Sequence, residues 1–525
     1  MIHSQSHTEA DEPLGQRLLR ASFPHATDKI QLLETHISWV ILTGSWAYKA
    51  KKPVRFEFLD YSTQPQRLQC CQRELEINRG WAPEIYDAVV PIVKRANGLR
   101  VGNPDESVGP DEQLIDHAVR MRQFPQSALL SEQLRTGGVV PAMMESLAKQ
   151  LAALHARVDA VEASPQLIER SSLEPARENI AFLLEQLPPE DPERTRVAAL
   201  GTWTNQTIRT ILPLLHVRAQ IGRVRNCHGD LHLDNLLYLD SKFLPFDGIE
   251  FNDALRQIDG ISELAFLTME LSEHHYHSHS HRLLSSYLEE SSDYQGLRLL
   301  PFYLVYRALV RVKVDLIRQQ QSAQPDDSAH GSNLSAAGRS YLAFAERAAQ
   351  PTSPELWITH GLSGSGKSTA SLSLVDQQGF VRLRSDVVRK HLAGLDPLAR
   401  PPAPQLPSLY AEEMTRRTYQ QLLDQAREAL TAGFRVIVDA AFLMRHQRDQ
   451  FADLAREQGA VFRILHCQAS PEEMRHRIRT RRNDPSDATL AVLNQQLRTA
   501  QPPAADELAV VVHPEDLDPA ATASD

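Results

Sequence analysis

The run Gly361-Leu-Ser-Gly-Ser-Gly-Lys-Ser-Thr369 constrains the fold of this chain more than any other segment. Its glycines allow the backbone to fold so that successive N–H groups point at phosphate oxygens where a helix begins. An apolar segment at 356–359 precedes the run, and a helical pattern follows it. Strand, loop and helix in this order are the context that such a motif requires, and they predict a phosphate-binding loop.

The side chains of this loop suit a nucleotide with a metal ion. Lys367 supplies a cation to the β- and γ-phosphates and is also expected to be catalytic, while the Ser368 hydroxyl is of the type that ligates Mg²⁺. ATP and Mg²⁺ are therefore the expected cofactors. The other nucleotide-binding residues expected here are Gly361, Ser363, Gly364, Ser365, Gly366 and Thr369.

Short apolar segments continue through the rest of this half. Strands are predicted at 380–383, 434–438, 461–465 and 508–512, with helical patterns between them. Strands that alternate with helices of this length favour a parallel, doubly wound sheet. This half is therefore predicted to be an α/β phosphate-loop domain.

Two carboxylates follow strands of that predicted sheet. Asp439 ends the segment FRVIVD and is the expected acidic partner of the Mg²⁺. Asp386 lies just beyond the second strand, at the sheet edge where ligands bind, and could accept a proton from a substrate hydroxyl. The alternative for Asp386 is a helix N-cap without a chemical role.

Five arginines crowd the segment 475–482. Such a cluster can close over a triphosphate as a lid, and Arg479 and Arg482 are the nucleotide contacts expected from it. The alternative is a solvated, charged helix face.

A second chemical pattern lies in the middle of the chain, in His228-Gly-Asp230-Leu-His-Leu-Asp-Asn235. The spacing Asp-x-x-x-x-Asn lets Asp230 take a proton from an acceptor hydroxyl while Asn235 turns to a Mg²⁺ ion. Asp247 follows a predicted strand and is the expected principal metal ligand. His228 is expected to be a structural hydrogen-bonding residue.

Upstream segments complete this pattern. Predicted strands at 37–42 and 46–51 are joined by a Gly44-Ser45 turn that suits an antiparallel hairpin. Lys49 is the expected nucleotide-binding lysine, with Lys51 as its competitor because alternate residues of a strand share a face. Glu74, in a helical segment, is the carboxylate expected to position that lysine, and a strand at 114–121 is expected to connect the two lobes.

A chain of 525 residues is too long for one core. The predicted organisation is an N-terminal extension at 1–24, a first domain at 25–347, a linker at 348–355 and the phosphate-loop domain at 356–525. The first domain has early strands followed by mostly helical patterns from about 140 to 345. This order predicts an α+β fold of two lobes, a small sheet lobe and a helical lobe.

The motifs together resemble known families. His-Gly-Asp in HGDLHLDNLL resembles aminoglycoside and choline kinases, so residues 25–345 look like an aminoglycoside-phosphotransferase-type, protein-kinase-like domain. Residues 355–515 resemble small P-loop kinases of the gluconate kinase, zeta-toxin and polynucleotide kinase type. The whole chain resembles a bacterial family of fusions of two such domains. The resemblance implies phosphotransfer to a hydroxyl group but does not fix the acceptor.

Two further features bear on ligands. Arg307 and Arg311 lie one turn apart in an apolar helical segment, where they either pair with Asp253, Asp259 or Glu263 or face the acceptor pocket and favour an anionic acceptor. The stretch 273–281 is rich in histidine, which invites a metal site, although alternating histidines are more typical of a solvated turn.

Composition and charge bear on the partners and the cellular location of the protein. A net charge of -10 and the lack of interleaved basic and aromatic residues argue against nucleic acid as a partner. The four cysteines have no metal-ligand spacing, and no apolar run reaches the roughly 20 residues that span a bilayer. The start of the chain lacks the features of a signal peptide. A cytoplasmic protein acting on a small molecule is expected.

Three functions are compatible with these patterns. The leading hypothesis is a bifunctional ATP-dependent kinase that phosphorylates hydroxyls of small, anionic or sugar-like molecules. The second is a nucleotide-dependent switch or ATPase coupled to a ligand-binding, kinase-like half. The third is a 5′-hydroxyl nucleic-acid kinase in the C-terminal half.

Overall fold

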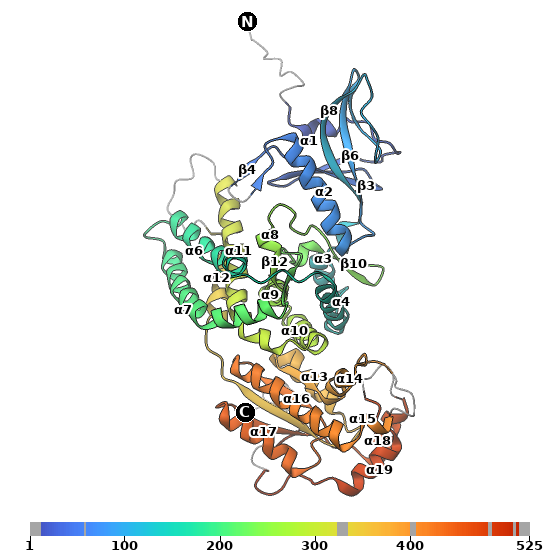
Figure 1. Ribbon diagram of the computed structural model, residues 1–525, viewed down its shortest axis with the longest axis vertical. Coiled ribbons are helices and arrows are strands. Elements are labelled where there is room, and N and C mark those ends of the chain that lie inside the picture. The colour runs from blue at the N-terminus through green and yellow to red at the C-terminus, as the bar shows by residue number, and fades with distance from the viewer. Residues whose placement is uncertain are drawn as a thin grey trace. The chain divides into compact units, whose positions relative to one another are not determined.

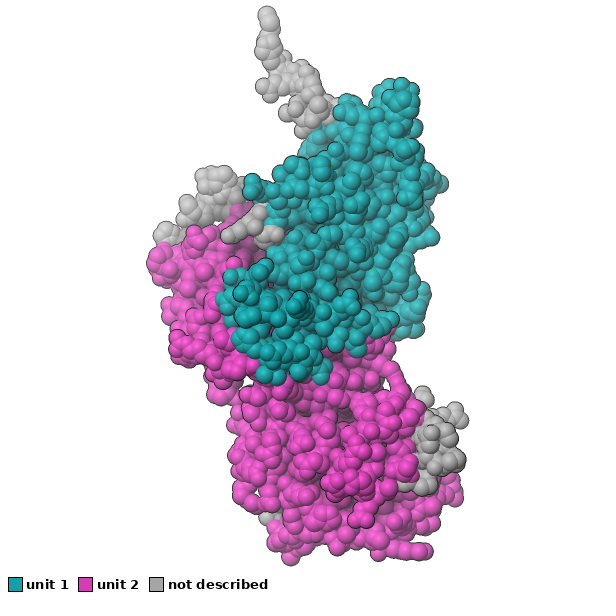
Figure 2. Space-filling view, viewed as in Figure 1, with its two compact units in different colours: residues 1–139, 154–175, 215–263 teal, residues 140–153, 176–214, 264–525 magenta. Residues whose placement is uncertain are grey.

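The computed structural model describes residues 12–56, 59–322, 334–399, 406–480, 486–507 and 511–513. Two compact units divide the chain (Figure 2). Unit 1 contains residues 1–139, 154–175 and 215–263, and unit 2 contains residues 140–153, 176–214 and 264–525. The linker predicted at 348–355 falls inside unit 2, so the compact units and the predicted domains divide the chain at different places.

Unit 1 is built on a six-stranded antiparallel sheet (Figure 1). Its strands, in spatial order, are β1 (Gln31–Glu34), β2 (Ser38–Leu42), β3 (Trp46–Lys51), β8 (Gln113–Arg122), β6 (Tyr86–Arg95) and β7 (Gly98–Val101). The predicted hairpin is present, because β2 and β3 pair antiparallel and Gly44 turns between them with φ of 98°. Strand β8 contains the predicted strand at 114–121 and pairs with β3.

Helix α2 (Gln64–Trp81) packs on this sheet against β6 and β8. Its start follows from the sequence. The Thr63 backbone N–H donates to Gln66 Oε1 at 3.1 Å, and Pro65 occupies the first turn, where no N–H is needed. The helix thereby begins at a fixed residue, which sets the phase that turns Glu74 toward the sheet.

The other elements of unit 1 are short. They are α1 (Leu14–Leu18), β4 (Arg55–Phe56), β5 (Leu59–Asp60), η1 (Gln126–Ala128), α3 (Leu130–Arg135), α5 (Pro165–Ile168), η3 (Glu169–Leu173), β9 (Val224–Asn226), η4 (Leu233–Asn235), β10 (Leu236–Leu239), β11 (Lys242–Pro245), α8 (Asp253–Arg256) and β12 (Gln257–Asp259). The antiparallel pair β10–β11 places Asn235 before one strand and Asp247 after the other. These two residues are therefore close in space, as their motif requires.

The first part of unit 2 is helical. Its elements, some of which extend into unit 1, are η2 (Pro141–Met143), α4 (Met144–Arg157), α6 (Glu174–Gln186), α7 (Pro192–Gln220), α9 (Gly260–Glu273), α10 (His277–Ser291), η5 (Tyr294–Arg298), α11 (Leu300–Ser322) and α12 (Ala336–Ala348). Leucine, valine and aromatic side chains from α6, α7, α9, α11 and α12 form one buried core. The predominance of helix after residue 140 agrees with the sequence pattern.

The second part of unit 2 is a five-stranded parallel sheet, as predicted. Its spatial order is β14 (Val381–Arg384), β15 (Val436–Asp439), β13 (Glu355–His360), β16 (Val461–His466) and β17 (Val511–Val512). Its helices are α13 (Lys367–Gln378), α14 (Ser385–Leu392), α15 (Leu406–Leu409), α16 (Glu412–Thr431), α17 (Arg445–Glu457), α18 (Pro471–Thr480) and α19 (Leu490–Thr499). Of the strand predicted at 508–512, residues 508–510 lie outside the described part of the chain.

Among the described residues, no helix combines the length and the apolar character needed to span a bilayer.

Candidate active sites

A cluster of buried charges surrounds Lys49 in unit 1. Its Nζ lies 2.9 Å from Glu74 Oε1 and also forms an ion pair with Asp247. Lys51, on the same face of β3, has its Nζ 2.5 Å from Glu74 Oε2 and forms an ion pair with Glu250. Glu74 therefore bridges the two lysines that the sequence left in competition, and Lys49 is the one that pairs with the expected metal ligand.

The charge state of Lys49 follows from its surroundings. Burial is the largest influence on its pKa and lowers it, but the Asp247 and Glu74 carboxylates together outweigh burial. The pKa of Lys49 is therefore raised well above its ordinary value, and the side chain is a cation. A fixed cation beside two carboxylates is the arrangement expected of a residue that meets phosphate oxygens.

Asp230 lies in an open part of the same unit, with 39% of its side chain exposed. The Asn235 amide nitrogen donates to the Asp230 backbone oxygen at 2.9 Å and to its Oδ2 at 3.1 Å. His232 Nε2 lies 3.5 Å from the same carboxylate oxygen. Asn235 thus fixes the proposed base, and its amide oxygen is the atom that a cation would bind.

Hydrogen bonds to Gly229 and His228 hold the backbone that precedes Asp230. Gly229 has φ of 89°, and its N–H donates to Glu263 Oε1 at 2.8 Å. Glu263 Oε2 in turn lies 2.7 Å from His155 Nε2. His228 is buried, its Nε2 lies 2.8 Å from the Phe246 carbonyl oxygen, and burial lowers its pKa, which suits the structural role expected of it.

Sequence patterns did not predict these roles of Glu250, Glu263 and His155. Their partners, Lys51 and Gly229, lie far away in the sequence, so no local motif marks them. His155, Cys227 and Glu263 offer three potential ligand atoms within 4.8 Å of one another. Because Glu263 already bonds to both His155 and the Gly229 N–H, this group acts as a support for the Asp230 loop.

The phosphate-binding loop of unit 2 has the predicted geometry. It connects β13 to α13, and its glycines at 361, 364 and 366 have φ of 156°, 84° and 99°. A Cβ on Gly361 would lie 2.4 Å from the Cys467 carbonyl oxygen, and one on Gly364 would lie 2.8 Å from the Met474 carbonyl oxygen. The loop therefore tolerates only glycine at these positions, and its fit to phosphate rests on its backbone.

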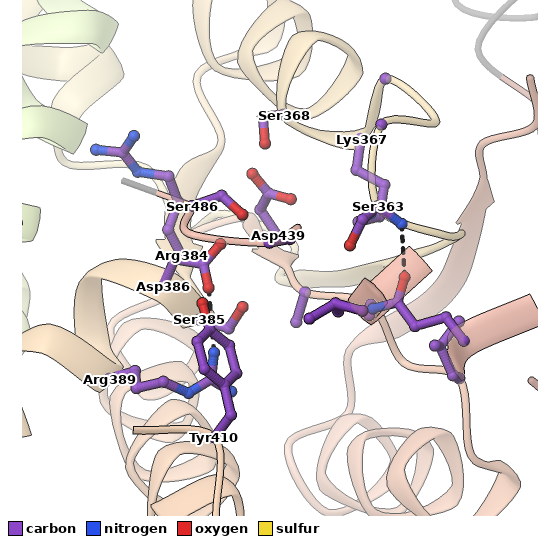
Figure 3. A pocket seen from close by; sticks show the side chains of 18 of the residues that line it. Ser363, Lys367, Ser368, Arg384, Ser385, Asp386, Arg389, Tyr410, Asp439 and Ser486 are labelled. Atoms are coloured by element: carbon purple, nitrogen blue, oxygen red, sulfur yellow. Dashed lines mark hydrogen bonds and ion pairs between the residues drawn. The ribbon is translucent and has the colours of Figure 1, made fainter. Parts of the chain in front are cut away.

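A cleft of about 760 Å³ opens at this loop (Figure 3). Of the residues predicted from sequence, those that line it are Ser363, Gly364, Gly366, Lys367, Ser368, Thr369, Asp386 and Asp439. Gly361 and Ser365 belong to the loop but are buried beneath this surface. Lys367 donates from Nζ to the Leu362 carbonyl oxygen at 2.9 Å. The cleft thus brings together a cation, a hydroxyl and two carboxylates, which is the set that a metal–triphosphate complex needs.

Asp386 lies in the first turn of α14, whose N-cap is Arg384. The structure therefore does not place Asp386 in the N-cap role that was its alternative. Its Oδ1 lies 3.1 Å from Arg389 Nη1, and the Arg389 guanidinium lies over the Tyr410 ring at 4.8 Å. Arg389, which sequence analysis did not select, holds this carboxylate in place at the cleft.

The arginine segment differs in detail from expectation. Arg477 lines the cleft and donates from Nη1 to the Gly364 carbonyl oxygen at 3.2 Å. Arg479 is exposed and is not among the described residues that line the cleft, and Arg482 lies outside the described residues. Residues two apart on a helix face different directions, so α18 turns Arg477 and not Arg479 to the loop.

The two other features that were expected to bear on ligands, the Arg307–Arg311 pair and the histidine-rich stretch, make contacts within the protein. Arg311 Nε lies 2.9 Å from Glu270 Oε1, and Arg307 lies over the Phe266 and Tyr306 rings. A carboxylate partner for Arg311 is thus confirmed, although it is none of the three proposed from sequence. The stretch 273–281 belongs to the end of α9 and the start of α10, and within the described residues it contributes no group of three potential metal ligands.

Two histidines end the neighbouring strands β13 and β16, and the first of them, His360, directly precedes the phosphate loop. His360 Nδ1 is 2.8 Å from His466 Nδ1. Burial, followed by the charges of His466 and Arg448, lowers the pKa of His360 to about 4, and burial also lowers that of His466. Because the unfolded chain binds more protons than the folded one between about pH 6.5 and 4, stability is lost as pH falls through this window.

We therefore expect the melting temperature of the phosphate-loop region to fall between pH 7 and pH 5, and His360→Gln to weaken that dependence. Calorimetry at several pH values, with the exposed His446→Gln on α17 as control, measures both. An unchanged slope in His360→Gln would contradict the assignment.

Comparison with known families identifies two domains. Residues 121–247 match the phosphotransferase enzyme family, and residues 356–503 match the AAA domain family. The chain thus combines a phosphotransferase domain with a P-loop, kinase-like domain, as the motifs predicted. It is an enzyme of the kinase class.

Relatives that match along most of this chain are found in mycobacteria. Uncharacterized proteins of Mycobacterium tuberculosis and Mycobacterium bovis are each 27% identical to this chain over 466 residues, covering 88% of this chain and 88% of theirs. Among solved structures, a choline/ethanolamine kinase family protein from Mesorhizobium loti is 13% identical and covers 63% of this chain and 92% of its own, with a TM-score of 0.37. A gluconokinase from Sinorhizobium meliloti is 18% identical and covers 31% and 82%, with a TM-score of 0.23.

Proposed function

We propose that the chain is a bifunctional kinase with two separate sites for ATP and Mg²⁺. Each site transfers a phosphoryl group to a hydroxyl of a small molecule, and the favoured acceptors are anionic or sugar-like. The observation that carries the proposal is the presence of two complete sets of cation, carboxylates and candidate base. One set lies wholly in unit 1 and the other wholly in unit 2.

In the first site, the residues divide the work of positioning and proton transfer. Lys49, held by Glu74, binds phosphate oxygens. Asp230 accepts the proton of the acceptor hydroxyl, and Asn235 keeps the carboxylate oriented for it. Asp247 and the Asn235 amide oxygen would hold the metal. ATP, bound there with Mg²⁺, supplies the phosphoryl group.

In the second site, the backbone N–H groups of the phosphate loop and the Lys367 ammonium bind phosphate oxygens. Ser368 and Asp439 would hold the metal, since both line the cleft at the carboxyl end of neighbouring strands. Asp386 accepts the proton of the acceptor, and Arg389 orients it. Arg477, from α18, lies where it can neutralise charge that develops on the transferred group. We also propose Arg479 and Arg482 as residues of a lid that contacts the nucleotide.

The test is the number of nucleotides bound. Calorimetry with a non-hydrolysable ATP analogue and Mg²⁺ is expected to give two per chain, and Lys49→Met and Lys367→Met are expected to give one each. Labelled ATP and a metabolite extract then report transfer, and each variant should remove a different product. One nucleotide per chain, or loss of the same product in both variants, would contradict two independent sites. Hydrolysis at full rate without acceptor would favour an ATPase switch, and labelling of an oligonucleotide would favour a nucleic-acid kinase.

A further inference from the structure

Helix α10, from the part of the chain before residue 348, covers the edge of the five-stranded sheet. Strand β14 is the edge strand, and the Arg382 backbone N–H on its open side donates to Ser285 Oγ at 3.0 Å. On the same face of α10, His281 Nδ1 lies 3.2 Å from the Asp376 carbonyl oxygen. The helix therefore completes a sheet edge that would otherwise be open, and both belong to unit 2.

One carboxylate on this helix pairs with two arginines of β14. Glu289 Oε1 accepts from Arg382 Nε at 3.0 Å, and Glu289 Oε2 forms an ion pair with Arg384. The Glu289 and Arg382 side chains are each only 4% exposed, and that of Arg384 is 24% exposed. Two guanidinium groups thus share one directly bonded carboxylate in a mostly buried place, which favours a further anionic partner in direct contact.

Arg384 is the member of this trio that can meet a ligand. It lies opposite Asp439 in the β14–β15 register and directly before Ser385 and Asp386, and its side chain lines the cleft (Figure 3). Its Nε is buried and has no hydrogen-bond partner among the described residues. Glu289 nevertheless leaves 24% of the Arg384 side chain exposed, and this side chain lines the cleft close to Asp386 in the sequence.

Of the neighbouring carboxylates, Asp439 and Glu145 act on Arg384 through space. Asp386 pairs with Arg389, and Glu145 of α4, which also lines the cleft, lies 2.8 Å through its Oε1 from Arg282 Nη1. Asp439 is the proposed metal ligand. None of the three is hydrogen-bonded to Arg384 within the described part of the structure.

We propose that Arg384 recognises an anionic group, a carboxylate or a phosphate, on the acceptor of the phosphate-loop site, and that Glu289 of α10 competes with this group for the guanidinium. The proposal rests on the proposed function of that site and narrows its substrate class to anionic acceptors. The acceptor-binding part of the cleft would then depend on two parts of the chain, because Glu289, which competes for Arg384, comes from helix α10.

Direct binding tests the proposal without turnover. The full-length protein is saturated with Mg²⁺ and a non-hydrolysable ATP analogue, so that the phosphate loop is filled, and inorganic phosphate is titrated by calorimetry. Arg384→Gln is expected to weaken phosphate binding about tenfold or more, because it removes a charge-assisted contact. Glu289→Gln is expected to tighten it about fivefold, because it removes a competing negative charge.

These opposite signs separate recognition from a structural role, since damage to the fold would weaken binding in both variants. Arg427→Gln, in an exposed ion pair of the same region, is the control and should bind phosphate as the unchanged protein does. Equal phosphate affinity in the unchanged protein and Arg384→Gln would overturn the proposal. So would a loss in Arg384→Gln of affinity for the analogue alone, because the arginine would then contact the transferred phosphoryl group.

An activity measurement separates failure of the anion site from failure of the proposed kinase function. Anion exchange divides a metabolite extract into anionic and neutral fractions, and the acceptor is expected in the anionic fraction, with a KM that rises in Arg384→Gln. No labelled product in any fraction, together with the phosphate-binding result above, would reject the proposed kinase function and leave the anion site standing. A neutral acceptor with an unchanged KM in Arg384→Gln would reject the anion site and leave the kinase function standing.

Discussion

Asp230→Asn is expected to lower phosphotransfer by the first site about 10³-fold, because the amide cannot accept the proton of the acceptor hydroxyl. The substitution keeps the size of the side chain, and the Asn235 amide nitrogen still has the backbone oxygen of residue 230 at 2.9 Å as an acceptor. Binding of Mg²⁺ and ATP should therefore change little. The measurement is transfer from labelled ATP to a metabolite extract, made in a Lys367→Met background so that only the first site acts.

Asp234→Asn is the matched control for this experiment. Asp234 lies in the same turn, is exposed and accepts a hydrogen bond from the Ser131 hydroxyl at 2.6 Å. The same chemical change there removes a negative charge at a similar place in the chain without touching the proposed base. Equal losses in the two variants would show that the effect is electrostatic or structural, and an active Asp230→Asn would exclude general base catalysis by this residue.

Local motifs predicted the parts of both sites that depend on backbone geometry and short spacing. The loop glycines at 361 and 364 are such a case, because any Cβ there would overlap neighbouring carbonyl oxygens. The spacing of Asp230 and Asn235 is another, since one turn of 3₁₀-helix brings the two side chains into hydrogen-bond contact. Functional residues that lie within about ten positions of one another can therefore be predicted from the sequence.

Long-range partners could not be predicted in this way. Glu263 meets Gly229 across 34 positions, and Glu289 meets Arg384 across 95, so only the packing of helices brings them together. Arg477, which lines the cleft, was not selected from the sequence for a different reason. A run of alternating arginines does not reveal the helix phase, so the sequence could not show that Arg477 rather than Arg479 is among the described residues that line the cleft.

The arrangement of the two lysines has the same origin and explains why sequence left them in competition. The alternation of β3 put Lys49 and Lys51 on one face, as expected. Their different roles arise from distant partners, Asp247 for the first and Glu250 for the second. Glu250 also accepts a hydrogen bond from the Tyr61 hydroxyl at 2.6 Å, which ties Lys51 to a fully enclosed network.

This difference predicts that the same substitution lowers stability at one lysine and nucleotide binding at the other. Lys51→Met is expected to destabilise unit 1 by about 3–5 kcal/mol, because it leaves the Glu74 and Glu250 carboxylates, 0% and 4% exposed, with one lysine fewer. Lys49→Met is expected to abolish nucleotide binding at the first site at a smaller cost in stability. Glu74 then keeps Lys51 as a partner, and Asp247, with 41% of its side chain exposed, is partly hydrated.

Urea unfolding followed by a probe in unit 1, together with calorimetry of the ATP analogue, separates the two effects. Lys52→Met is the control, since this neighbouring lysine pairs with an exposed Glu34 and should shift the unfolding midpoint little. Equal midpoints for Lys51→Met and Lys52→Met would mean that the buried network does not stabilise the fold. Retained nucleotide binding in Lys49→Met would indicate that Lys51 binds the phosphate. Lys51 is the only other lysine that contacts Glu74 among the described residues.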